Sequence, residues 1–200
     1  IHDVGKGSSK MNEITLANLL RIMPHLKIVR AGYFLPALNA AMAEFHIDTP
    51  VRQAAFIAQI AHESGSFTYL REIADGSSYD DRADLGNTRP EAIEIARIND
   101  TTPGRFYRGR GLIQITGYDN YAACSEALFG DTATLTHNPF ILERKEPACR
   151  SAAWYWFSRG LNAIADAGNF EKITRRINGG LAGYPDRLAF HQRALKELTA

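Results

Sequence analysis

The chain has 200 residues, of which 45% are hydrophobic and 22% are charged, and its formal net charge is +1 at pH 7. A chain of this length and composition can bury one hydrophobic core, so we expect a single globular domain. The balanced charge excludes the strongly basic surface of a nucleic-acid binder, and no apolar run approaches the roughly 20 residues needed to cross a bilayer. We expect a monomer without nucleic-acid partners and without membrane insertion.

The first ten residues, IHDVGKGSSK, are polar and contain glycine and serine. They lack the apolar segment of a secretory signal peptide. We therefore interpret residues 1–10 as a tag or linker and residues 11–200 as one domain, and we expect the protein to be made in the cytoplasm.

Cys124 and Cys149 are the only cysteines in the chain. Neither lies in a Cys-x-x-Cys or Cys/His spacing, so the sequence predicts no zinc site, and we expect neither a metal nor a cofactor. Unpaired cysteine behaves as a small buried hydrophobe. Two buried thiols are therefore a better prediction than a disulfide.

Apolar residues recur at helical spacing along most of the chain, and the alternating pattern of strands is scarce, so we predict a mainly α-helical fold. Thr49 and Pro50 are the residue types of an N-cap and a first helical position, and the apolar run after them predicts a helix ending near Gly65. Further helices are expected at residues 30–46, 90–98, 118–129, 147–159, 169–178 and 185–198.

Between two of these helices, residues 75–87 are polar and rich in turn-forming types. This composition predicts a small β-hairpin or a mobile loop beside a cleft. No internal repeat or low-complexity tract indicates a second domain. The predicted architecture is one compact domain with two lobes.

Glu63 lies where an apolar helix is predicted to end, in the sequence AHESG at residues 61–65. A carboxyl group at such a helix end can be partly desolvated and so keep a proton near neutral pH, as a general acid must. Taken alone, a glutamate in a last helical turn is more often a solvated surface group. The zinc-protease alternative fails because its pattern needs a second histidine at the position of Ser66.

Glu72 is the candidate second carboxylate, nine positions after Glu63. A continuous helix would separate the two residues by about 13 Å, but a chain reversal at Gly65 would allow the roughly 6.5–9.5 Å that an inverting glycosidase needs. Asp80 and Asp81 compete for the role of general base, because their loop could approach the same cleft. Simple solvation of a loop carboxylate is the alternative for each of the three.

The segment FYRGRGLIQITG, residues 106–117, alternates glycine with arginine before a short apolar run with the character of a strand. Glycine lets a backbone approach a ligand closely, and arginine there could hold carboxylates by paired hydrogen bonds. Gln114 and Thr116 could bind sugar groups or a water molecule. A structural turn with Arg110 buried in an ion pair is an equally good interpretation of the arginines.

Aromatic residues give two further expectations. The Trp-Tyr-Trp run at residues 154–156 lies among apolar residues at helical spacing, so we expect it in the core rather than in a sugar-stacking surface. Phe106, Tyr107 and Tyr118 are better candidates for the cleft, and we expect Tyr107 to contact substrate.

Three motifs occur in order: HESG at 62–65, YRGRGLIQITG at 107–117 and INGG at 177–180. Together they resemble family 19 glycoside hydrolases, relatives of plant chitinases, and most closely the bacteriophage endolysin branch of that family. The resemblance spans about residues 30–195, and only the YRGRG segment is highly specific by itself. It implies a mainly helical, lysozyme-like fold with a cleft between two lobes.

The resemblance also implies roles for single residues. Glu63 is then the general acid, Glu72 the general base, and Thr116 the residue that helps to position the attacking water. Sugar-binding and carboxylate-supporting positions of the family match Gln114, Asn120, Asn178 and Arg187. The chain lacks the cysteine framework of plant chitinases, and its aspartates at 80 and 81 stand where related phage sequences often have a glutamate.

The sequence therefore predicts an endolysin that hydrolyses the β-1,4 bond between amino sugars of peptidoglycan strands for host cell lysis. We expect it to reach the cell wall through a membrane lesion such as a phage holin makes, or else by an export signal outside this sequence. One alternative is a chitinase with the same catalytic plan. Another, from a different class, is a noncatalytic glycan-binding domain, against which the presence of both glutamates argues.

Overall fold

The computed structural model describes residues 13–200, so the tag or linker expected at residues 1–10 lies outside the described part. As predicted, the described chain is mainly α-helical. The longer helices begin and end within about two residues of the predicted bounds. The α-helices are α1 (Leu16–Ile22), α2 (Ile28–Glu44), α3 (Pro50–Glu63), α4 (Pro90–Ile98), α5 (Pro103–Phe106), α6 (Tyr118–Phe129), α7 (Ala133–His137), α8 (Lys145–Ser158), α9 (Leu161–Asp166), α10 (Phe170–Asn178) and α11 (Tyr184–Leu198).

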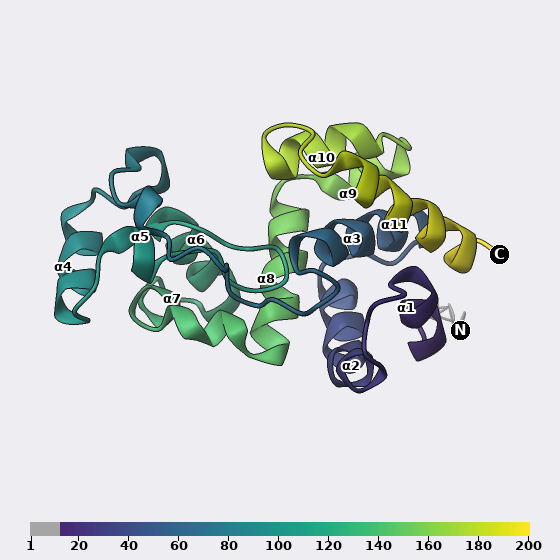
Figure 1. Ribbon diagram of the computed structural model, residues 1–200, viewed down its shortest axis with the longest axis horizontal. Helices are drawn as coiled ribbons and strands as arrows, with labels where there is room; N and C mark the ends of the chain where they lie inside the picture. Colours follow the sequence, from purple (N-terminus) through teal and green to yellow (C-terminus); the bar gives the residue numbers. More distant parts are fainter. Residues whose placement is uncertain (1–12) are drawn as a thin grey trace, which may run out of the picture.

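The helices form two lobes with α8 between them, which confirms the two-lobed prediction (Figure 1). One lobe contains α4, α5, α6 and α7. The other is built on the pair α3 and α11, with α1, α2, α9 and α10 around it, and it carries both ends of the described chain (Figure 1). Two extended segments, one after α3 and one before α6, run side by side from lobe to lobe and are joined by the backbone bridge between Arg71 and Arg110.

Helix α3 is the central element of the second lobe. The side chain of Thr49 accepts a hydrogen bond from the backbone N–H of Arg52, and Pro50 occupies the first helical position, as the sequence predicted. Nine of its fourteen residues, from position 53 to position 61, are buried. A helix enclosed in this way is a rigid support for the residue at its end, Glu63.

The chain reverses direction directly after α3. Gly65, Ser66 and Phe67 have φ angles of 55°, 54° and 63°, so three consecutive residues are left-handed. Left-handed backbone is costly for residues other than glycine and persists only where the surroundings hold it. Phe67 is fully buried against Phe34, with ring centroids 5.4 Å apart. This packing stabilises the reversal that the sequence placed at Gly65.

The β-hairpin expected within residues 75–87 is not formed, and among residues 13–200 the only β pairing is two isolated bridges. The segment instead contains two 3-10 helices, η1 (Ser77–Tyr79) and η2 (Ala83–Leu85). The amide of Asn87 donates to the carbonyl of Tyr79, 2.8 Å away, and so closes the segment on itself. The sequence here lacks the alternation of apolar and polar residues that would give a hairpin one buried face.

Cys124 and Cys149 are both buried and unpaired, as expected. Burial raises the pKa of each thiol to about 12. Both cysteines therefore stay protonated and act as apolar packing groups.

Within residues 13–200 no group of three or more His, Cys, Asp or Glu side chains is arranged to bind a metal ion. No helix of the described chain is long and apolar enough to span a membrane.

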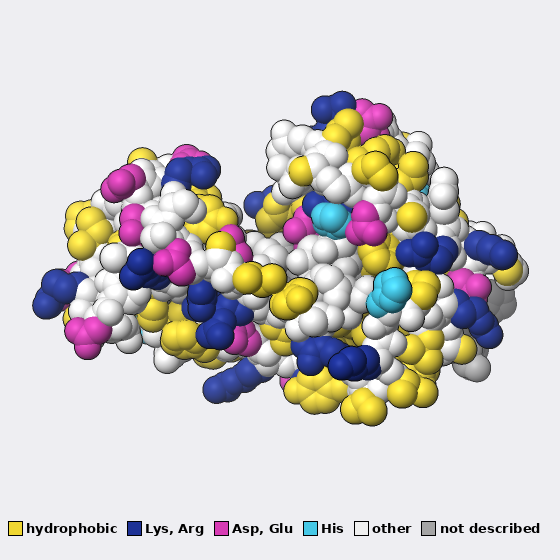
Figure 2. Space-filling model, viewed as in Figure 1, with side chains coloured by type: hydrophobic (Ala, Val, Ile, Leu, Met, Phe, Trp, Pro, Cys, Tyr) yellow, Lys and Arg dark blue, Asp and Glu magenta, His cyan; other side chains and the backbone are white. Residues whose placement is uncertain are grey.

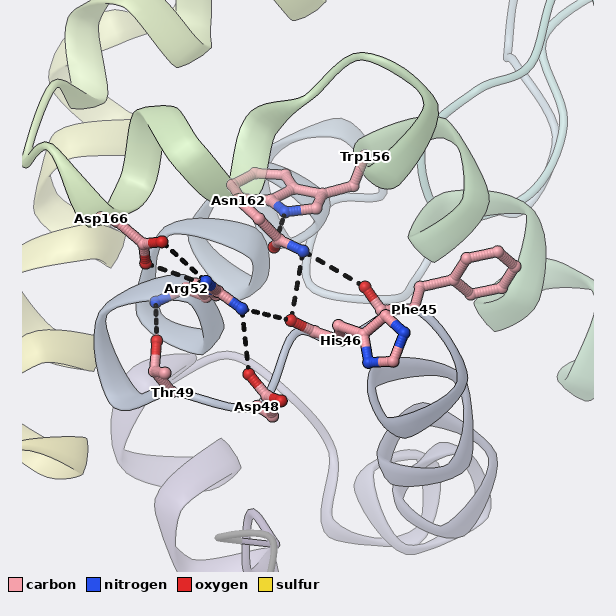
Figure 3. Close-up of polar contacts among 8 residues, drawn as sticks. All are labelled: Phe45, His46, Asp48, Thr49, Arg52, Trp156, Asn162 and Asp166. Carbon is pink, nitrogen blue, oxygen red and sulfur yellow. Dashed lines mark hydrogen bonds and ion pairs between the residues drawn. The ribbon is translucent and has the colours of Figure 1, made fainter.

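A polar network joins the loop between α2 and α3 to α8 and α9 (Figure 3). The guanidinium of Arg52 forms two hydrogen bonds of 2.8 and 2.7 Å to Asp166 and a third, of 2.9 Å, to the carbonyl of His46. Asn162 accepts a 2.7 Å bond from the indole N–H of Trp156 and donates to the carbonyls of Phe45 and His46. This network fixes the start of α3 relative to α8.

We predict that Asn162→Ala lowers the free energy of unfolding by about 2–3 kcal/mol, because it leaves the indole N–H of buried Trp156 without an acceptor. Asn99→Ala is the matched control, because the Asn99 side chain is exposed and donates only within its own helix. Urea unfolding of the two variants measures the difference. Equal effects would show that the network does not stabilise the fold.

Candidate active site

A cavity of about 680 Å³ opens between the lobes. Figure 2 shows the molecule hollowed between the lobe of α4 and α5 and the lobe that carries α10. Most of the lining residues are polar or aromatic, which suits a sugar ligand. The polar and aromatic lining residues include Glu63, Arg71, Glu72, Tyr79, Arg82, Gln114, Thr116, Asn120, Tyr155, Arg159 and Asn178.

Glu63, the last residue of α3, faces this cavity with its side chain 20% exposed. Its carboxylate forms a 2.6 Å ion pair with Arg187, which lies in the first turn of α11 and is 2% exposed. A buried guanidinium needs both a counter-charge and hydrogen-bond partners for its remaining protons. Arg187 obtains these by donating to the side chain of Gln59 at 2.6 Å and to the carbonyl of Ala182 at 3.2 Å.

The polar chain continues into α10. The amide of Gln59 donates to the hydroxyl of Thr174 at 2.9 Å, and both residues are fully buried. Gln59 of α3, backed by Thr174 of α10, therefore holds Arg187 of α11 and, through it, Glu63. The carboxyl group of Glu63 is fixed in orientation, and a negative charge on it has a counter-charge in place.

Glu72 lies in the segment that returns after the reversal. Its carboxylate accepts a 2.8 Å hydrogen bond from the hydroxyl of Tyr79 and a 3.1 Å bond from the backbone N–H of Gly109. Burial, and then the hydrogen bond to Glu72, raise the pKa of Tyr79 to about 12. Tyr79 therefore remains a donor to Glu72 over the range in which enzymes work.

Glycine at position 109 leaves room for two side chains of the cavity wall. A Cβ at this residue would lie 2.8 Å from the side-chain oxygen of Gln114 and 3.3 Å from a carboxylate oxygen of Glu72. A larger residue would therefore force the end of the Gln114 side chain to shift and crowd the carboxylate of Glu72. Glycine in this segment was expected to let the backbone approach a ligand closely. At position 109 the groups that approach closely are instead two side chains of the protein, Gln114 and Glu72.

The arginines of the YRGRG segment do not line the cavity. Arg110 is 2% exposed, pairs with Glu143 at 2.9 Å, and donates to the carbonyl of Phe106 at 2.7 Å. The interpretation of a structural turn with Arg110 in a buried ion pair is therefore confirmed. The strand-like run is a series of turns, because Gly111 and Gln114 have positive φ angles of 78° and 60°.

Gln114, Thr116, Asn120 and Asn178 all line the cavity. The hydroxyl of Thr116 donates to the carbonyl of Gln114 at 2.9 Å, and the amide of Asn120 donates to the carbonyl of Thr116 at 2.8 Å. Asn178, at the end of α10, comes from the opposite lobe. The expected polar positions of the site are therefore brought together on one cavity.

Tyr107 is a wrong prediction as a substrate contact. It is fully buried, and its hydroxyl donates to the carbonyl of Thr136 at 2.9 Å, away from the cavity. Phe106, also proposed for the cleft, is 4% exposed and packs edge-on against the Tyr107 ring. Aromatic type alone did not distinguish these core residues from cleft residues.

The alternatives to Glu72 do not reach the site. Asp80 accepts a 2.8 Å hydrogen bond from the backbone N–H of Gly104 and so anchors the start of α5, and Asp81 is exposed. Neither aspartate lines the cavity. Of the three carboxylates, only Glu72 lines the cavity together with Glu63.

Tyr155, expected in the core, is partly buried against it and also lines the cavity, whereas Trp156 is 1% exposed and in the core as predicted. The guanidinium of Arg159 stacks on the Tyr155 ring, with its carbon 3.4 Å from the centroid. Helical spacing could have predicted this difference. Ala152 and Trp156 share a buried face of α8, whereas Tyr155 lies about 100° around the helix from Trp156.

No family model matches the chain. The chain is 31% identical over 192 residues to a Haemophilus influenzae protein described as a glycosyl hydrolase family 19 domain-containing protein, covering 86% of this chain and 90% of that protein. It is 35% identical over 127 residues to an endochitinase of Arabidopsis thaliana, of which it spans only 38%. Chitinase C from Streptomyces griseus superposes with a TM-score of 0.72 over 94% of this chain and 77% of that one, at 24% identity, and so shares the fold. Because the match to the Haemophilus protein extends over nearly the whole of both chains, this chain belongs to glycosyl hydrolase family 19.

Proposed function

We propose that the protein hydrolyses β-1,4 glycosidic bonds between the amino sugars of peptidoglycan, with inversion at the anomeric carbon. One observation carries the proposal: Glu63 and Glu72 line one cavity, and each is held by partners of its own. No hydrogen bond joins these two carboxylates. Two separated carboxylates with room for a water molecule are what an inverting glycosidase requires.

Glu63 acts as the general acid and protonates the glycosidic oxygen as the C–O bond breaks. Proton transfer leaves a carboxylate, whose charge is stabilised by the adjacent guanidinium of Arg187. The leaving sugar departs with a free hydroxyl. Arg187 is a positioning residue, because it is buried behind Glu63 and reaches the substrate only through it.

Glu72 acts as the general base toward a water held between its carboxylate and Thr116. Since the Thr116 hydroxyl donates its proton to the Gln114 carbonyl, its free lone pairs can accept a hydrogen bond from the water. The second proton of the water goes to Glu72, and its oxygen attacks the anomeric carbon from the face opposite the leaving group. Gln114, Asn120 and Asn178 supply amides for sugar hydroxyl and acetamido groups.

Chitin is the second candidate substrate, since relatives of this chain are described as endochitinases. The two polymers share the β-1,4 linkage and the N-acetyl groups and differ in the acidic peptide stems of peptidoglycan. Mass analysis of products from purified cell walls and from chitin oligosaccharides separates the two candidates, and NMR of the first-formed anomer tests inversion. The absence of any new reducing ends from both substrates would favour a noncatalytic glycan-binding domain.

An endolysin role in host cell lysis is part of the same proposal. It requires release of soluble muropeptides from intact walls at a rate that lowers the turbidity of permeabilised cells. Cleavage of chitin without this effect would contradict the endolysin role and leave the glycosidase chemistry in place.

We predict that Glu63→Gln lowers kcat on native glycan by about 10³-fold, because the proton donor is lost while the shape is kept. On an oligosaccharide with a dinitrophenyl leaving group, which needs no proton, the same variant should keep most of its activity. Glu72→Gln should be impaired on both substrates, because water must still be activated. Equal losses of Glu63→Gln on the two substrates would contradict the acid role.

The Glu63→Gln variant requires a folding control, because the change removes the counter-charge of buried Arg187. Near-ultraviolet circular dichroism and thermal unfolding of each variant should therefore accompany the rates. Rates are compared at a temperature at which each variant is fully folded.

We predict that Gly109→Ala lowers kcat at least about tenfold, because the added methyl group displaces Glu72 and Gln114 from the cavity wall. The φ angle at this position is not in the left-handed region, so the backbone itself tolerates alanine. Gly130→Ala is the contrasting variant: its Cβ would meet no atom within 4 Å, but its φ of 80° is strained. Gly130→Ala should lose stability and keep activity. A Gly109→Ala enzyme with normal kcat would contradict this account of Glu72.

A further inference from the structure

Three arginines line the catalytic cavity: Arg71, Arg82 and Arg159. Arg82 is neutralised by Asp84 through two hydrogen bonds of 2.7 and 2.6 Å. In contrast, neither Arg71 nor Arg159 has a carboxylate partner among the described residues. Two guanidinium groups therefore face the cavity with their charge unpaired.

These charges are not needed by the two catalytic candidates. Glu63 has its own counter-charge in Arg187, and Glu72 has its hydrogen-bond donors in Tyr79 and Gly109. Neither carboxylate is hydrogen-bonded to Arg71 or Arg159. Both guanidinium groups are therefore free to bind a ligand in the cavity.

The two arginines differ in how they are held. Arg159 is half-buried, fixed by stacking on the Tyr155 ring, and burial lowers its pKa, which shows that its charge is poorly solvated. Arg71 is exposed, and no hydrogen bond from its side chain to the described residues is formed. Whether half-buried or exposed, a guanidinium is stabilised by a carboxylate that accepts two parallel hydrogen bonds from its N–H groups.

Resting on the proposed function, we propose that Arg71 and Arg159 bind carboxylate groups carried by the substrate and so select an acidic glycan over a neutral one. In peptidoglycan these groups are the free carboxylates of the peptide stems. Chitin offers none. The role that the sequence suggested for Arg108 and Arg110 is thus assigned to two arginines elsewhere in the chain, since Arg108 and Arg110 lie outside this cavity.

The test compares Arg71→Gln with wild type on two matched pairs of substrates. One pair is native peptidoglycan and the same material with its carboxylates converted to neutral amides. The other is carboxymethyl chitin and neutral chitin oligosaccharide. We expect kcat/KM of Arg71→Gln to fall about tenfold on each acidic substrate and less than about twofold on each neutral one.

Arg97→Gln is the control, because it makes the same change in net charge at an arginine that is 69% exposed on α4 and outside the cavity. Its kcat/KM should match wild type on all four substrates. Equal losses of Arg71→Gln on acidic and neutral substrates, or no loss on either, would overturn the proposal. Failure of wild type to cleave peptidoglycan would instead refute the proposed function, and the chitin pair would still decide the role of Arg71.

Discussion

The site depends on one buried cation. The side chain of Arg187 extends from α11 toward α3 and is 2% exposed. Its guanidinium forms an ion pair with Glu63 on the cavity side and donates a hydrogen bond to Gln59 on the inner side. A buried charge that lost either kind of partner would be strongly destabilising. Helix packing in this lobe and the orientation of Glu63 are therefore determined by the same interaction, so the fold cannot relax here without moving the proposed general acid.

The second carboxylate is held by a different device. Among the described residues Glu72 has no counter-charge, and it is positioned by neutral donors, Tyr79 and the backbone of Gly109. Hydrogen bonds fix the orientation of this carboxylate while leaving it able to take up a proton, as its proposed role of general base requires. In the proposed mechanism this contrast has a chemical use: the charged partner lies behind Glu63, which would end as a carboxylate, and neutral partners surround Glu72, which would end protonated.

Patterns within short stretches of sequence predicted the features that depend on neighbouring residues alone. Helical period and capping residues gave the long helices, but α5, α7 and α9 contain only four to six residues, too few for a periodic signal. The choice of Glu72 over Asp80 depends on contacts far apart in sequence, with Gly109 and Gly104 as the respective partners. Residue type likewise could not separate buried Tyr107 from cavity-lining Tyr155, because that difference is made by tertiary packing.

Net charge is a further case in which a whole-chain quantity hides the local one. A formal net charge of +1 indicates no particular binding partner. It is a sum in which buried, paired arginines and cavity-lining, unpaired arginines count alike. Arg110 and Arg187 are buried and paired, so they contribute to structure and present no charge to a ligand. Arg71 and Arg159 have no carboxylate partner within residues 13–200 and lie on the wall of one cavity, where a low-dielectric boundary strengthens their field. An acidic polymer would therefore be recognised by the distribution of charge in the cavity, at a protein whose total charge is close to zero.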